Sequence, residues 1–167
     1  RTEAIWHKGD PGVREAYDDA VSALIDESGA DLVVLAGYLR LVSESFTARW
    51  KDKLINIHPS LLPSFKGLHV HQAALDAGVK FAGCTVHYVV PEVDSGPIIS
   101  QAVVPVLPGD DAGKLAQRIL KQEHRIYPQV IRWIAEGRVS VDATGIVTVA
   151  DAKPADMAEI NPTLEPG

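Results

Sequence analysis

The sequence has a single cysteine, Cys84, and no apolar run near the roughly 18 residues that would suggest a membrane span. One cysteine excludes an intramolecular disulfide, so the chain gives no sign of an oxidising compartment. Residues 1–6 lack the basic start and apolar stretch of a secretory signal peptide. The expected location is therefore the cytoplasm, with no membrane partner.

The chain also has fewer basic than acidic residues, with 16 Lys and Arg against 22 Asp and Glu, which gives a formal net charge of −6. Binding to a phosphate backbone normally requires a basic face, so nucleic acid is not an expected partner. Net charge does not exclude one local pocket for a small anion. At 167 residues, with 46% hydrophobic and 23% charged residues, the chain fits one ordinary globular domain.

Helical and strand patterns alternate along the chain. Helices are predicted at 10–28, 43–50, 71–77 and 110–136, and strands at 32–36, 54–57, 83–90 and 97–106. This alternation predicts an α/β fold with a mostly parallel sheet flanked by helices. Pro128 predicts a kink or a restart in the last helix. Residues 139–149 predict a hairpin around Thr144-Gly145, and an extended or mobile tail follows.

Reactive groups in open α/β sheets gather beyond the carboxyl ends of strands, and two such places carry polar residues. Asn56 and His58 lie two apart at the end of a short strand, so their side chains point the same way. Asp94 follows the next strand. An amide donor beside an imidazole suits acyl chemistry, and a carboxylate could orient the imidazole or stabilise its protonated form.

Each of these residues also has a structural explanation. A strand-end Asn often satisfies backbone groups, a lone His is usually a surface or core residue, and Asp94-Ser-Gly is an ordinary turn sequence. His69 and His71 could suggest a metal site, but no nearby carboxylate or cysteine completes a ligand set, so no metal is expected.

Three separated blocks of sequence resemble the signature of the glycinamide ribonucleotide (GAR) formyltransferases. These blocks are Ile55-Asn-Ile-His-Pro-Ser-Leu-Leu-Pro63, Gly67-Leu-His69 and Val93-Asp-Ser-Gly-Pro97. Segments 35–40 and 122–128 are also similar to family segments, so the resemblance covers about residues 12–138. It implies a Rossmann-like formyltransferase fold. It also implies transfer of a formyl group from 10-formyltetrahydrofolate, the cosubstrate, to the amine of GAR in purine synthesis.

The resemblance also implies roles for individual residues. Asn56 would hydrogen-bond the formyl oxygen as negative charge develops on it, and His58 would be the neighbouring acid/base or electrostatic partner. Asp94 would orient these groups, and a water, for proton transfer out of the attacking amine. The folate would contact Leu39, Arg40, Leu41, Arg14, Val89, Val90 and Pro91, and the ribonucleotide would contact Pro59, Gly67 and Glu123.

The family also begins with a strand, a Gly-Ser-x-Asn type loop, a helix and a second strand, and that loop binds the ribonucleotide phosphate at a helix N-terminus. Only a short segment precedes the first helix predicted in this chain, and it begins with Arg1 rather than Met. The missing portion could belong to a longer protein, come from another chain or have been lost. On this view residues 1–138 are the catalytic portion and 139–167 the hairpin and tail. An unpaired sheet edge would favour self-association, so a homodimer stays open.

Two alternatives to GAR formylation stay open. One is a formyltetrahydrofolate hydrolase, which uses a similar Asn, His and Asp set with water as the acceptor. The other is a non-catalytic folate-binding remnant. A methionyl-tRNA formyltransferase is disfavoured by the acidic charge and by the absence of a C-terminal RNA-binding domain. Turnover of GAR separates the first function from the others, and formate release without an amine acceptor would support the hydrolase.

Overall fold

The structure, a computed structural model, describes residues 11–38, 40–153 and 161. The elements follow in the order α1 (Pro11–Ser28), β1 (Val33–Leu35), α2 (Glu44–Arg49), β2 (Leu54–His58), α3 (Val70–Asp76), β3 (Phe81–Tyr88), β4 (Ile98–Pro105), α4 (Ala112–Ala135), β5 (Val139–Val141) and β6 (Val147–Val149). None of the helices in these ranges combines the length and apolar character that crossing a membrane requires.

The helix ends follow the local sequence signals. The Ser43 hydroxyl accepts the N–H of Phe46 at the start of α2, and the Asp111 carboxylate accepts the N–H of Lys114 at the start of α4. Gly137 ends α4 with a φ of +68°, a conformation that costs glycine little. Of the two outcomes predicted at Pro128, the restart is wrong, because α4 continues through this residue as one helix, and the kink stays a prediction.

The main sheet is mixed, with strand order β1-β2-β3-β4. β1 and β2 are parallel, whereas β2–β3 and β3–β4 are antiparallel. The α/β prediction is confirmed, but the prediction of a mostly parallel sheet is wrong for the described strands. Parallel neighbours need a long crossover connection. Residues 89–97, which join β3 and β4, contain no helix, so the chain simply turns back.

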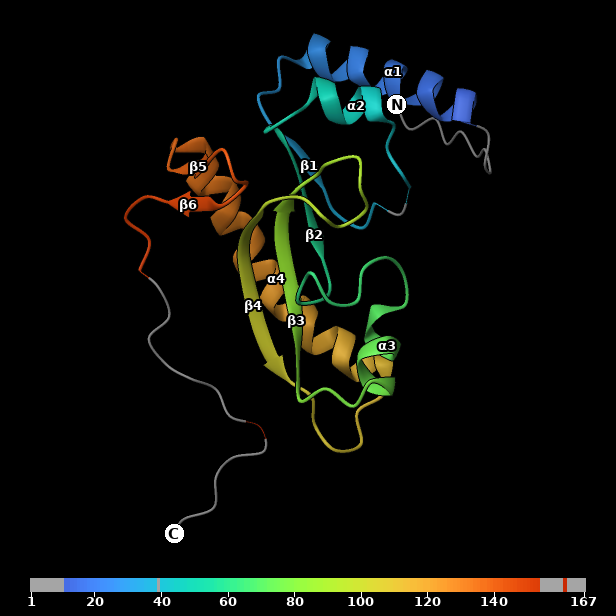
Figure 1. Ribbon diagram of the computed structural model, residues 1–167, viewed down its shortest axis with the longest axis vertical. Helices are drawn as coiled ribbons and strands as arrows, with labels where there is room; N and C mark the ends of the chain where they lie inside the picture. The colour runs from blue at the N-terminus through green and yellow to red at the C-terminus, as the bar shows by residue number, and fades with distance from the viewer. Residues whose placement is uncertain (1–10, 39, 154–160, 162–167) are drawn as a thin grey trace.

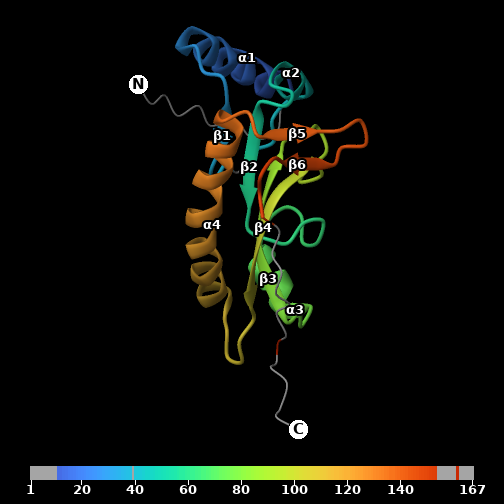
Figure 2. The same cartoon turned by 90° about the vertical axis from the view of Figure 1, so that its left-hand side faces the viewer.

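Helix α4 lies along β3 and β4 in both views (Figure 1, Figure 2), and it buries Leu115, Ile119, Tyr127 and Val130. The Tyr127 hydroxyl lies 2.6 Å from the carbonyl oxygen of Leu35 and 3.2 Å from that of Ile55, so α4 is joined to both β1 and β2. Helices α1 and α2 pack together beside β1 (Figure 1). The core therefore packs against β2 and β3, the strands that carry the candidate site.

The predicted hairpin is confirmed as β5 and β6, which pair antiparallel; their four valines pack on the core beside α4. The predicted tail falls mostly outside the described residues. Asn161 is described, and its side-chain amide donates to the backbone oxygens of Lys80 and Val106. The division of the chain at residue 138 stays a prediction.

Candidate active site

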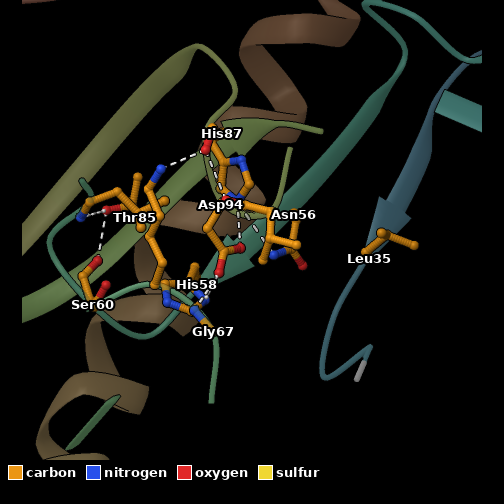
Figure 3. A network of polar contacts seen from close by, with 12 residues as sticks. Leu35, Asn56, His58, Ser60, Gly67, Thr85, His87 and Asp94 are labelled. Carbon is orange, nitrogen blue, oxygen red and sulfur yellow. Dashed lines mark hydrogen bonds and ion pairs between the residues drawn. The ribbon is translucent and has the colours of Figure 1, made fainter. Parts of the chain in front are cut away.

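Strand β2 positions Asn56 and His58 on one side of the sheet, as their spacing predicts. The antiparallel register sets His87 of β3 opposite Asn56. Asp94 lies in the loop after β3, and Figure 3 shows its carboxylate among the side chains of Asn56, His58 and His87. The three residues predicted to be catalytic therefore lie together.

The Asp94 carboxylate meets both histidines and one backbone amide. Its Oδ2 atom lies 3.4 Å from Nδ1 of His58 and accepts the N–H of Gly67 at 2.8 Å, while its Oδ1 atom lies 3.7 Å from Nε2 of His87. Asp94 has a φ of +49°, a left-handed conformation that Asp tolerates better than most residues. These contacts hold the carboxylate against His58.

The imidazole of His58 is buried and is held from two sides. Its Nε2 atom lies 3.0 Å from the carbonyl oxygen of Phe65. A carbonyl oxygen can only accept, so Nε2 carries a proton in this arrangement. Nδ1 is then the nitrogen that faces Asp94.

His87 is a site residue that the sequence analysis missed. Its Nδ1 atom lies 2.8 Å from the carbonyl oxygen of Tyr88, so Nδ1 is the donor and Nε2 of the neutral ring is an acceptor. The side-chain amide of Asn56 donates to that Nε2 at 3.4 Å, which leaves the second amide N–H of Asn56 for another oxygen. Burial lowers the pKa of His87, and this outweighs the opposing effects of the Tyr88 carbonyl and Asp94. The available signal was a pair of polar residues, Thr85 and His87, alternating within an apolar strand.

A cavity of about 650 Å³ opens in front of these residues. It is lined by every described residue of the predicted site, namely Arg14, Arg40, Leu41, Asn56, His58, Pro59, Gly67, Val89, Val90, Pro91, Asp94 and Glu123. Leu39, the remaining predicted contact, lies outside the described residues. His87, Tyr38 and His71 also line the cavity, although the sequence analysis assigned them no role in binding. A volume in this range suits a small-molecule site.

Two arginines contribute positive charge to the lining. Arg14 comes from α1, and Arg40 comes from the loop after β1. The Arg40 guanidinium carbon lies 4.1 Å from the ring centre of Tyr17, a cation–π contact that holds this side chain on α1. The cavity therefore carries a local cationic region although the whole chain is acidic.

Two further titratable groups line the cavity near His58. Burial raises the pKa of Glu123, and the nearby His124 and His58 only partly oppose this. Burial also lowers the pKa of His71, and His58 adds to that effect. Both groups therefore favour their uncharged forms more than exposed groups would. Within the described parts of the chain, no three His, Cys, Asp or Glu side chains are grouped so that they could hold a metal ion.

An amide and an imidazole from the end of β2 and a carboxylate from the loop after β3 face one cavity, and together they can hold a developing oxyanion and move a proton. This arrangement accords with the family comparison. The formyl transferase family matches residues 4–131, and the chain belongs to that family.

Individual relatives agree with the family. The chain is 48% identical over 128 residues to phosphoribosylglycinamide formyltransferase of Escherichia coli strain K12, covering 77% of this chain and 60% of that protein. It is 45% identical over 144 residues to the trifunctional purine biosynthetic protein adenosine-3 of Gallus gallus, covering 86% of this chain. The match spans only 14% of the Gallus gallus protein's length.

Solved structures share the fold. Glycinamide ribonucleotide transformylase 1 of Symbiobacterium toebii superposes with a TM-score of 0.80 at 49% identity, covering 86% of this chain and 68% of that chain. A formyltetrahydrofolate deformylase of Pseudomonas syringae superposes with a TM-score of 0.79 at 36% identity, covering 85% and 47% of the two chains. The Rossmann-like formyltransferase fold expected from the sequence is confirmed.

Proposed function

We propose that this chain transfers a formyl group from 10-formyltetrahydrofolate to the amine of glycinamide ribonucleotide. The observation that carries the proposal is the convergence of Asn56, His58 and Asp94 at the wall of one cavity. The names of the relatives at 45–48% identity support the same reaction. On this proposal residues 1–138 form the catalytic portion, with residues 139–167 as a hairpin and tail.

The reaction begins when the amine nitrogen attacks the formyl carbon and gives a tetrahedral oxyanion. The free amide N–H of Asn56 and the protonated ring of His58 stabilise that oxygen. Asp94 accepts the proton that the amine loses, directly or through a water, and then gives it up, through water, to the folate nitrogen as the bond from that nitrogen to the formyl carbon breaks. The products are the formylated amine and tetrahydrofolate, and the proton count balances without a metal or a covalent enzyme intermediate.

The two substrates would occupy different parts of the cavity. The folate would contact Leu41, Val89, Val90 and Pro91, and its carboxylates would pair with Arg14 and Arg40, the cationic part of the lining. Leu39 is proposed beside Arg40 in the same pocket. The ribonucleotide would contact Pro59, Gly67 and Glu123, with the Glu123 carboxylate facing its amine.

The proposal is tested by replacing His58 with alanine and measuring formyl transfer to glycinamide ribonucleotide. His58→Ala is expected to lower kcat by about 10²–10³-fold, the range for losing one group that stabilises an oxyanion, while folate affinity stays close to that of the wild type. The matched control is His124→Ala, because His124 is exposed on α4. Near-normal turnover by the His58 variant would contradict the assigned role.

Hydrolysis of formyltetrahydrofolate is the second candidate, and the deformylase structure that shares this fold favours testing it. In that reaction water replaces the amine as the nucleophile, and the products are formate and tetrahydrofolate. Formate release without an amine acceptor, together with no formylated ribonucleotide, would support the hydrolase. Folate binding with neither product would support a non-catalytic binding module.

A further inference from the structure

Three side chains form one row across the sheet. In the strand register, His58 of β2 lies opposite Thr85 of β3, and Thr85 lies opposite Gln101 of β4. Thr85 is fully buried, and the function proposed above uses neither Thr85 nor Gln101. The register therefore places two polar residues, Thr85 and Gln101, in line with the candidate catalytic histidine on the next two strands of the sheet.

Thr85 and Gln101 bind the backbone of the loop that follows β2. The Thr85 hydroxyl donates to the carbonyl oxygen of Ser60 at 2.7 Å and accepts the N–H of Leu62 at 3.0 Å (Figure 3). The side-chain amide of Gln101 donates to the carbonyl oxygen of Leu62 at 2.9 Å and to the Thr85 hydroxyl at 3.0 Å. The Thr85 hydroxyl thus makes all three hydrogen bonds of which it is capable.

The same loop makes one contact with each of the two ionisable residues of the proposed trio. The Ser60 hydroxyl donates to the carbonyl oxygen of Ser64 at 2.7 Å. The next carbonyl, that of Phe65, faces Nε2 of His58, and the Gly67 N–H donates to Asp94. Phe65 has a φ of +54°, which is unfavourable for a bulky residue and requires the surrounding contacts to hold it.

The Phe65 carbonyl and the Asp94 carboxylate compete for the single N–H of the neutral His58 ring. A neutral imidazole has one proton, which can lie on Nε2 toward the Phe65 carbonyl or on Nδ1 toward Asp94. Loosening the loop would weaken the first partner. The Asp94 carboxylate would lose part of its contact with the Gly67 N–H but would keep its contacts with His58 and His87, so the proton would move to Nδ1.

We propose that Thr85 and Gln101 are positioning residues that hold loop 59–67 so that the Phe65 carbonyl keeps the proton of His58 on Nε2. Neither residue lines the cavity, and both act through the loop backbone. Both ring nitrogens carry protons in the charged form that stabilises the oxyanion, so the effect on rate comes from the position of the ring and rests on the function proposed above. The position of the single proton in the neutral ring does not depend on turnover.

The test compares Thr85→Val and Gln101→Met, which remove the polar groups at nearly constant volume, with Thr85→Ser, which keeps the hydroxyl. Nitrogen NMR of the full chain labelled at histidine reports which ring nitrogen of His58 is protonated, at a pH where the ring is neutral. The His58 signals are assigned from their loss in His58→Gln. Both polar-group deletions are expected to shift the proton from Nε2 toward Nδ1, and Thr85→Ser to stay close to the wild type.

Activity is the second measurement. Both deletions are expected to lower kcat about 10- to 100-fold, as for a small displacement of a catalytic group, with little change in folate affinity. A His58 Nε2 that stays protonated as in the wild type in both deletions overturns the positioning role, whatever the activity. A shifted proton in an enzyme whose wild type transfers no formyl group supports the positioning role and rejects the proposed function. If Thr85→Val does not fold, Gln101→Met decides.

Discussion

His58 and Asp94 face each other at 3.4 Å, measured from ring Nδ1 to carboxylate Oδ2. On the other side of the ring, Nε2 lies against the Phe65 carbonyl. Both acceptors are satisfied at once only when both ring nitrogens carry protons. The arrangement therefore suits a positively charged imidazole that stabilises an oxyanion, with Asp94 as the group that takes up the proton of the amine.

Asn56 should be sensitive to the loss of its amide hydrogens. Asn56→Asp keeps the size of the side chain, but it replaces two N–H donors by a second carboxylate beside Asp94 and His87. We expect kcat to fall about 10²–10³-fold, the effect of losing one oxyanion donor. Steady-state kinetics at saturating folate and ribonucleotide would measure this. An unchanged kcat would show that Asn56 does not bind the oxyanion.

The raised pKa of Glu123 leads us to expect that ribonucleotide binding depends on pH. Burial raises the pKa of Glu123 above its ordinary 4.5, so the carboxylate becomes neutral at a higher pH than an exposed one. The KM for glycinamide ribonucleotide, whose amine is positively charged when protonated, should therefore rise as the pH falls through the Glu123 pKa.

Glu123→Gln should raise this KM at neutral pH and remove its dependence on pH in that window. The measurement is KM for each substrate between mildly acidic and neutral pH. Glu136→Gln is the control, because Glu136 lies at the exposed end of α4. A variant with the wild-type pH dependence would show that another group causes it.

The lowered pKa of His87 leads us to expect that the free energy of unfolding depends on pH. Burial lowers the pKa of His87 below its ordinary 6.5, so the unfolded chain takes up a proton at a higher pH than the folded chain. Between the two pKa values the unfolded state binds more protons, and the free energy of unfolding therefore falls as the pH falls through this window. Burial lowers the pKa of His71 in the same direction.

His87→Gln should make this dependence on pH less steep by up to one proton. Urea unfolding at a series of pH values below neutrality measures the slope directly. The same experiment on His71→Gln should remove a further part. A His87 variant with the wild-type slope would show that the folded protein accepts a proton at this position without cost.

The hydroxyl group of Tyr127 is expected to contribute to the stability of the folded chain. Tyr127→Phe removes the hydrogen bond to Leu35 and the weaker contact with Ile55, and it leaves a buried carbonyl without that partner. The free energy of unfolding should fall by about 1–3 kcal/mol. Tyr88→Phe is the matched control, since the Tyr88 hydroxyl has no hydrogen bond to any residue in the described ranges, and its effect should be much smaller.

Much of the fold could be predicted because the ends of its helices depend on residues that are close together in the sequence. Ser43, Asp111 and Gly137 mark helix ends through caps and a left-handed conformation, and these signals need no knowledge of the rest of the chain. Strand direction is different, because it depends on the path of the connection. A helical pattern before β3 suggested a crossover, but α3 is short and β3 runs antiparallel to β2.

The same distinction applies to the candidate site. Asn56, His58 and Asp94 were predicted together because three sequence blocks resemble one family, and the structure brings them to one cavity; their catalytic roles stay predictions. His87 was missed because its place opposite Asn56 follows from the antiparallel register. The Phe65 carbonyl could not be predicted either, because its position depends on backbone conformation and not on the side chain.

The hydrogen bond from Tyr127 to Leu35 joins residues 92 positions apart in the chain. Closing a loop of that length costs about 4 kcal/mol of chain entropy by the logarithmic estimate, before any contact offsets it. Local pairs such as β3 with β4 and β1 with β2 are closed more cheaply, so we expect them to form before α4 is joined to β1 and β2. The contact between α4 and the parallel strand pair is then secured late. Because β1 has one neighbour in the described sheet and β3 has two, the amide hydrogens of β1 should exchange with solvent faster than those of β3.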